Sequence, residues 1–328
     1  MPAQSGRGTR FRLSPGRSGQ DRREPVAYAA MVNDSGSGQF KRFGSYEVVR
    51  FLGEAGGARV YRARQVSVDR FVTLTILPRQ QMEKIAYRTR FERQVAAASK
   101  LRHPNILSAI DAGSVGGHQY LVSESVDGQR LSVALAAGEW FGVHRAVRIA
   151  LAMARALEHV DSVGMLHRNL TPQCVLLGDA GMVKLRGFSF SRPHREGASE
   201  TWFEPDDYGV QYKAPDWVTH KTLDIRADLY SLGCVLYELL TGRPPFRGGT
   251  SASILERHVK QPPPDPSTLR SDVTPDLQAV VMRLLAKDRD ERYATATEVV
   301  TDLDAIEQEK PIVKPKKSKR RRLFGRKK

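Results

Sequence analysis

Residues 167–174 (His-Arg-Asn-Leu-Thr-Pro-Gln-Cys) bring polar side chains together at a spacing suited to phosphoryl transfer. This chemistry uses a carboxylate that accepts a hydroxyl proton and a hard oxygen ligand that holds magnesium. Where such a loop would carry the proton-accepting carboxylate, the chain has Asn169, whose amide is not a base. Where it would carry the magnesium ligand, the chain has Cys174, whose thiol binds magnesium poorly. The run therefore predicts a loop with the shape of a catalytic loop but without its reactive groups.

Other short motifs flank this run in a fixed order. On the amino-terminal side they are residues 52–61 (Leu-Gly-Glu-Ala-Gly-Gly-Ala-Arg-Val-Tyr), 72–75 (Val-Thr-Leu-Thr) and 101–106 (Leu-Arg-His-Pro-Asn-Ile). On the carboxyl-terminal side they are residues 183–189 (Val-Lys-Leu-Arg-Gly-Phe-Ser), 214–216 (Ala-Pro-Asp), 224–233 (Asp-Ile-Arg-Ala-Asp-Leu-Tyr-Ser-Leu-Gly) and Arg292. Over residues 46–309 this ordered set resembles the serine/threonine protein kinase family, particularly its bacterial-type members.

The resemblance implies an α+β, two-lobed protein kinase-like fold. Its N-lobe, about residues 46–124, would be a small antiparallel sheet with one main helix, and its larger C-lobe, about residues 127–309, would be mainly helical. Alternating apolar residues predict antiparallel strands at 46–52, 60–66 and 71–77, helical spacing predicts a helix over 84–101, and 118–123 is a further strand before a hinge at 124–127.

In the C-lobe, apolar residues at three-to-four spacing predict core helices over 147–160 and 229–240. The second should end at Gly242, which suits a left-handed cap and is followed by prolines. The resemblance also implies five scaffold residues: His167, Phe188, Asp216, Asp228 and Arg292. Asp216 is one methylene shorter than the family's glutamate, and we expect it to pair with Arg292.

At five positions where the family carries its catalytic groups, this chain has other residue types. They are Thr75 for the strand lysine, Gln94 for its glutamate partner, Asn169 for the base, Cys174 for one metal ligand and Gly187 for the other. In the Gly-rich turn, Ala55 and Ala58 stand where the family has glycine. The sequence therefore predicts no metal site and no catalytic residues.

The adenine end of the nucleotide site is better preserved. By resemblance its walls are Leu52, Val60, Thr73, Glu124, Val126 and Leu176, with backbone hydrogen bonds from residues 124–126. No cofactor is required by these residues, and we expect any ATP binding to be weak and independent of metal. A pocket collapsed onto its own side chains is an equal alternative.

From these replacements the leading hypothesis is a pseudokinase, a catalytically inactive signalling or scaffold protein that binds protein partners and is not an enzyme. The first alternative is a weak or atypical serine/threonine protein kinase that uses ATP. The second is a protein that binds nucleic acid or an anionic membrane through its tail.

The formal net charge of +16 is concentrated at the two ends of the chain. Residues 310–328 hold eleven Lys or Arg and no acid, and residues 1–45 are basic and rich in Gly, Ser and Arg. We expect both segments to be disordered tails, with polyanion contact through residues 310–328. No stretch is apolar enough for a membrane span, and the two cysteines are far apart in the chain, so we expect no disulfide framework. We therefore expect a cytoplasmic protein, which would lie at the inner membrane surface if the tail binds lipid.

Overall fold

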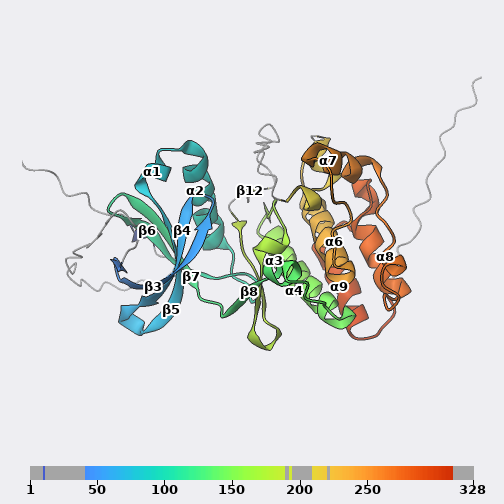
Figure 1. The fold of residues 1–328 in the computed structure, drawn as a ribbon, viewed down its shortest axis with the longest axis horizontal. Coiled ribbons are helices and arrows are strands. Elements are labelled where there is room, and N and C mark those ends of the chain that lie inside the picture. The colour runs from blue at the N-terminus through green and yellow to red at the C-terminus, as the bar shows by residue number, and fades with distance from the viewer. Residues whose placement is uncertain (1–9, 12–40, 189–191, 194–208, 220–221, 313–328) are drawn as a thin grey trace, which may run out of the picture.

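The computed structural model describes residues 10–11, 41–188, 192–193, 209–219 and 222–312. Most of the two predicted tails, 1–45 and 310–328, falls outside the described residues. Within them, the chain forms two lobes joined near the end of strand β7 (Figure 1).

The N-lobe is an antiparallel sheet with helices on one side (Figure 1). In the described residues its strand order is β1-β6-β7-β5-β4-β3-β2. The strands are β1 Arg10–Phe11, β2 Arg42–Phe43, β3 Tyr46–Ala55, β4 Ala58–Gln65, β5 Arg70–Leu77, β6 Ala109–Val115 and β7 His118–Glu124, and the helices are α1 Arg79–Met82 and α2 Ile85–Lys100. Alternation on β5 explains the sheet, because Val72, Leu74 and Ile76 are fully buried on one face.

The C-lobe is mainly helical. Its helices are α3 Leu131–Ala136, α4 Val143–Ser162, α5 Pro215–Val218, α6 Ile225–Thr241, α7 Ser251–Lys260, α8 Pro275–Leu284 and α9 Ala296–Glu307. Two small sheets lie between these helices and the N-lobe: β8 Gly128–Arg130, β10 Val175–Gly178 and β11 Val183–Leu185 form one in the order β11-β10-β8, and β9 Met165–Leu166 pairs with β12 Arg192–Pro193.

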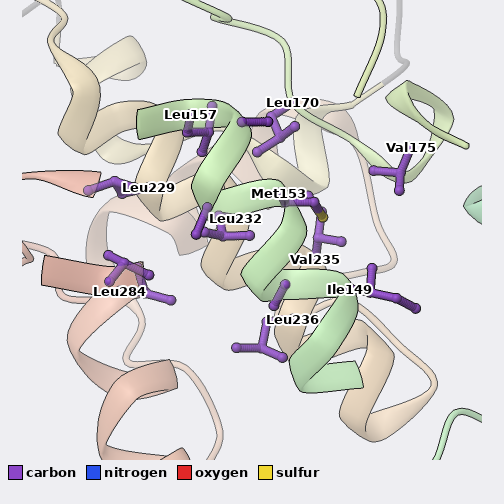
Figure 2. Close-up of a cluster of buried hydrophobic side chains, with 14 of the residues drawn as sticks. Ile149, Met153, Leu157, Leu170, Val175, Leu229, Leu232, Val235, Leu236 and Leu284 are labelled. Atoms are coloured by element: carbon purple, nitrogen blue, oxygen red, sulfur yellow. The ribbon is translucent and has the colours of Figure 1, made fainter. Parts of the chain in front are cut away.

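Helices α4 and α6 form the centre of the C-lobe core. Figure 2 shows Ile149, Met153 and Leu157 of α4 facing apolar side chains of α6. Leu170 and Val175, from the segment that carries the motif at 167–174, point into the same cluster, so the core also positions that motif. Helix α6 ends at Gly242, whose φ of 72° is left-handed.

The predicted α+β, two-lobed kinase-like fold is confirmed. The strands expected within 46–77 and 118–123 and the helices expected over 84–101, 147–160 and 229–240 are all present, with ends shifted by a few residues. In the part of the chain that the structure describes, no helix combines the length and apolar character needed to cross a bilayer.

A buried ion pair connects α5 with the segment before α9. Arg292 Nη1 lies 2.7 Å from Asp216 Oδ2, and the two side chains are 0% and 6% exposed. The guanidinium also donates to the carbonyl oxygens of Arg226, Ala286 and Lys287. Asp216 therefore supplies the negative charge for a cation that water cannot reach.

We expect Asp216→Ala to lower the free energy of unfolding by about 3 to 5 kcal/mol, because it leaves the Arg292 charge buried without its partner. Asp216→Glu restores the carboxylate and serves as the matched variant, with a smaller loss. Urea denaturation followed by circular dichroism measures both. A loss below about 1 kcal/mol for the alanine variant would show that the pair is not needed for folding.

Candidate functional site

Asp228, on α6, fixes the start of the loop at 167–174 by hydrogen bonds to its backbone. The Asp228 carboxylate accepts hydrogen bonds from the backbone amides of His167 and Arg168, at 2.7 and 2.8 Å. Burial raises the pKa of this carboxyl, against the lowering effect of His167 and the two amides. The backbone of Arg168 has a left-handed φ of 66°, so the loop adopts a conformation that needs this support.

Three further contacts, from His167 and Cys174, hold the loop in place. The His167 and Phe188 rings meet edge to face with centroids 4.7 Å apart, and His167 Nε2 lies 3.0 Å from the carbonyl oxygen of Arg186. The Cys174 thiol donates to the carbonyl oxygen of Asn169 at 3.3 Å. The loop is thus fixed to the segment after β11 as well as to α6.

The five positions with replaced residue types converge in space. Thr75 of β5, Gln94 of α2, Asn169, Cys174 and Gly187 all line one cavity of about 490 Å³ between the lobes. The structure therefore brings together residues that span more than a hundred positions in the sequence.

A second cavity of about 450 Å³ adjoins the first. Its lining includes all six residues expected at the adenine end: Leu52, Val60, Thr73, Glu124, Val126 and Leu176. The Glu124 carboxylate accepts hydrogen bonds from the Ser108 amide at 2.7 Å and from Lys184 Nζ at 2.8 Å, so this side chain holds the hinge in place. The cleft is large enough for a drug-sized ligand such as a nucleoside.

The residues present do not fit the divalent metal that kinase chemistry implies. Gly187 has no ligand atom, its φ is 92°, and a Cβ added there would lie 3.0 Å from Cys174 Sγ. Thiols are soft ligands, whereas Mg²⁺ prefers oxygen. Among the described residues, no group of three His, Cys, Asp or Glu is arranged to bind a metal ion.

Sequence reasoning missed three basic residues at this site. Lys213 Nζ donates to Asn169 Oδ1 at 2.8 Å and lies 4.7 Å from the centre of the Trp217 ring. Burial lowers the pKa of Lys213 to about 8. Arg130 and Arg186 line both cavities. The sequence gives no signal for them beyond the position of Arg186 directly before Gly187, because the chain has 52 Lys and Arg in all.

Comparisons with known proteins agree with this architecture. The family model of the protein kinase domain matches residues 46–303. The chain is 33% identical over 274 residues to a probable serine/threonine-protein kinase of Streptomyces coelicolor. The aligned region covers 82% of this chain and 41% of that protein. It is 35% identical over 263 residues to the serine/threonine-protein kinase PknB of Mycolicibacterium smegmatis (79% and 42%), and 33% identical over 275 residues to PknB of Mycobacterium leprae (83% and 44%).

These relatives correct the prediction of an inactive scaffold that is not an enzyme. Proteins that match most of this chain are named serine/threonine-protein kinases, and this contradicts the pseudokinase hypothesis. The physical reason for the error is that replaced residue types show which groups are absent, whereas they do not show which other groups lie at the site, such as Lys213 at Asn169.

The chain spans less than half the length of these relatives. From the match over residues 46–303, the chain belongs to the protein kinase domain family.

Proposed function

We propose that this chain is an atypical serine/threonine protein kinase, which transfers the γ-phosphoryl group of ATP to a hydroxyl group of a protein substrate. The observation that carries the proposal is the inter-lobe cleft, where the six adenine-wall residues line one cavity and residues 169 and 174 line the cavity next to it. The names of the relatives support the same reaction.

The adenine ring would occupy the cavity walled by Leu52, Val60 and Leu176, against the hinge. Its triphosphate would extend into the adjoining cavity, toward Asn169. In the transfer, the bond from the γ-phosphorus to its bridging oxygen breaks, a bond from the substrate hydroxyl oxygen forms, and ADP leaves. The hydroxyl proton then needs an acceptor, which an amide cannot be.

We assign that role to the amine of Lys213. Its Nζ lies 2.8 Å from Oδ1 of Asn169, which lines the cavity and stands at the position of the family's base. Burial lowers the pKa of Lys213 to about 8, so roughly a tenth of the molecules carry a neutral amine at pH 7. Position and pKa together suit a general base.

Purified protein incubated with ATP labelled at the γ-phosphate should incorporate label into serine or threonine of a generic protein substrate. We expect a turnover below the roughly 1 to 100 per second of typical kinases, because the catalytic groups differ. Thr73→Trp, which fills the adenine cavity, is the control for co-purifying kinases, and its unfolding temperature shows whether it is folded. Absence of incorporation, or equal incorporation by the wild type and this variant, would contradict the proposed function.

The rate of transfer should rise with pH through about 8, because only the deprotonated amine of Lys213 accepts a proton. Lys213→Arg keeps the positive charge but cannot deprotonate in this range, so it should lower kcat by about 10² to 10⁴ and remove this limb of the pH profile. Rates measured from pH 6 to 9.5 test both points. A variant that retains the wild-type profile would exclude Lys213 as the base.

We also propose that the chain acts in the cytoplasm on protein substrates, with residues 310–328 as a polyanion contact. Eleven basic residues without an acid in this segment support the proposal. Each Lys or Arg near an anionic bilayer contributes about 1 kcal/mol to binding. Contacts between basic residues and DNA phosphates also weaken as the salt concentration rises.

The full chain should therefore bind anionic vesicles or DNA at low salt and release them at high salt. A chain that ends at Glu309 should lose this binding and unfold at the same temperature as the full chain. Vesicle co-sedimentation and a DNA mobility shift, run in parallel, decide which polyanion is preferred. Binding that persists in the truncated chain would place the contact elsewhere.

A further inference from the structure

The three-stranded sheet β11-β10-β8 presents one face to the cleft. Leu176 of β10 pairs with Arg130 on one side and with Lys184 on the other. The Arg186 amide donates to the carbonyl oxygen of Cys174, two residues before Leu176, which continues the ladder beyond β11. Because cross-strand partners share a face and alternate residues return to it, Arg130 and Arg186 flank the floor of the cleft.

Both arginines line the boundary between the two cavities. The residues common to the adenine cavity and to the cavity at Asn169 are Val60, Thr75, Gln94, Arg130, Arg186 and Gly187. A nucleotide that passes from one cavity to the other must therefore pass these two guanidinium groups, at the point where its phosphates begin.

Arg130 and Arg186 have no acidic partner among the residues that the structure describes. The acids in the two linings have other basic partners: Asp127 pairs with Arg62 at 2.8 Å, Glu124 with Lys184 at 2.8 Å and Glu54 with Arg59 at 3.8 Å. Burial, together with the nearby charge of Arg130, lowers the pKa of Arg186. Two cations thus share a partly buried site without a counter-ion, which is costly unless an anion joins them.

The backbone fixes the position of each group before any ligand arrives. Arg186 donates its amide to Cys174 at 2.8 Å and accepts from His167 Nε2 at 3.0 Å. Arg130 ends β8 and directly precedes α3, so its backbone is held by β10. Two guanidinium groups on a fixed sheet are suited to bidentate contacts with phosphate oxygens.

We propose that Arg130 and Arg186 bind the phosphates of a nucleoside triphosphate, in place of the divalent metal whose ligands this chain does not have. The inference deepens the proposed function, because it names the groups that hold the ATP of that reaction. Gly187, directly after Arg186, has no carboxylate at the position where the family pattern has its metal ligand.

Calorimetric titrations of the full chain with ATP, ADP, adenosine and inorganic tripolyphosphate, each in EDTA and in excess Mg²⁺, test the proposal. In EDTA, ATP should bind about tenfold or more tightly than adenosine, and tripolyphosphate should compete with ATP. Magnesium should weaken ATP binding or leave it unchanged, since the metal neutralises charge that the arginines would otherwise contact. ATP binding that requires Mg²⁺, or equal affinities for ATP and adenosine, would overturn the proposal.

Variants at the two positions assign the effect to the arginines. Arg186→Gln and Arg130→Gln should each weaken ATP about tenfold or more while the affinity for adenosine stays the same. Arg148→Gln, an exposed arginine on α4 outside both cavities, is the matched control and should not change ATP binding. Unfolding temperatures without ligand check that each variant is folded. The tripolyphosphate titration of the wild type tests phosphate binding independently of any variant.

The outcome is separable from that of the proposed function. Metal-free ATP binding that depends on both arginines, without phosphoryl transfer, would leave this proposal standing and remove the kinase activity. Transfer that needs Mg²⁺ and is indifferent to Arg130→Gln and Arg186→Gln would do the opposite.

Discussion

The carboxylate of Asp228 joins the core of the C-lobe to the cleft. It belongs to α6, a helix that is buried along nearly its whole length, and it accepts the two amides that begin the loop at 167–174. The left-handed φ of Arg168 costs about 1 to 2 kcal/mol, which the two charge-assisted hydrogen bonds offset. Because α6 packs against α4 in the apolar cluster of Figure 2, the position of the loop is determined by the packing of the two longest helices.

Much of the fold could be predicted because it depends on local pattern. Alternation on β5, helical spacing in α4 and α6, and the glycine after α6 are properties of short segments, and each gave the correct element. The six residues expected at the adenine end line one cavity, and their grouping followed from the resemblance, which carries long-range pairing that no short pattern contains. The sheet β11-β10-β8 was missed, since its three strands are only 3, 4 and 3 residues long and β8 pairs with β10 across about fifty positions.

The candidate site was harder to predict than the fold for a related reason. The five replaced positions could be identified from the resemblance to the family, but other groups that lie near them come from other elements. Lys213 precedes α5, and Arg130 ends β8, so their approach to Asn169 and to Arg186 depends on tertiary structure alone. The absent residue types therefore predicted an inactive protein, and the relatives named as kinases contradict this prediction.

The bonds of Glu124 have a mechanical consequence for the two lobes. Residues 105–107 exchange backbone hydrogen bonds with Leu185, Asn105 also donates to the carbonyl of Val183, and Glu124 binds both Ser108 and Lys184. This edge of the N-lobe is thereby attached to the C-lobe sheet and must stay with it when the lobes move. The hinge side of the cleft is therefore linked across the lobes by backbone and side-chain hydrogen bonds, which resist a change in its width.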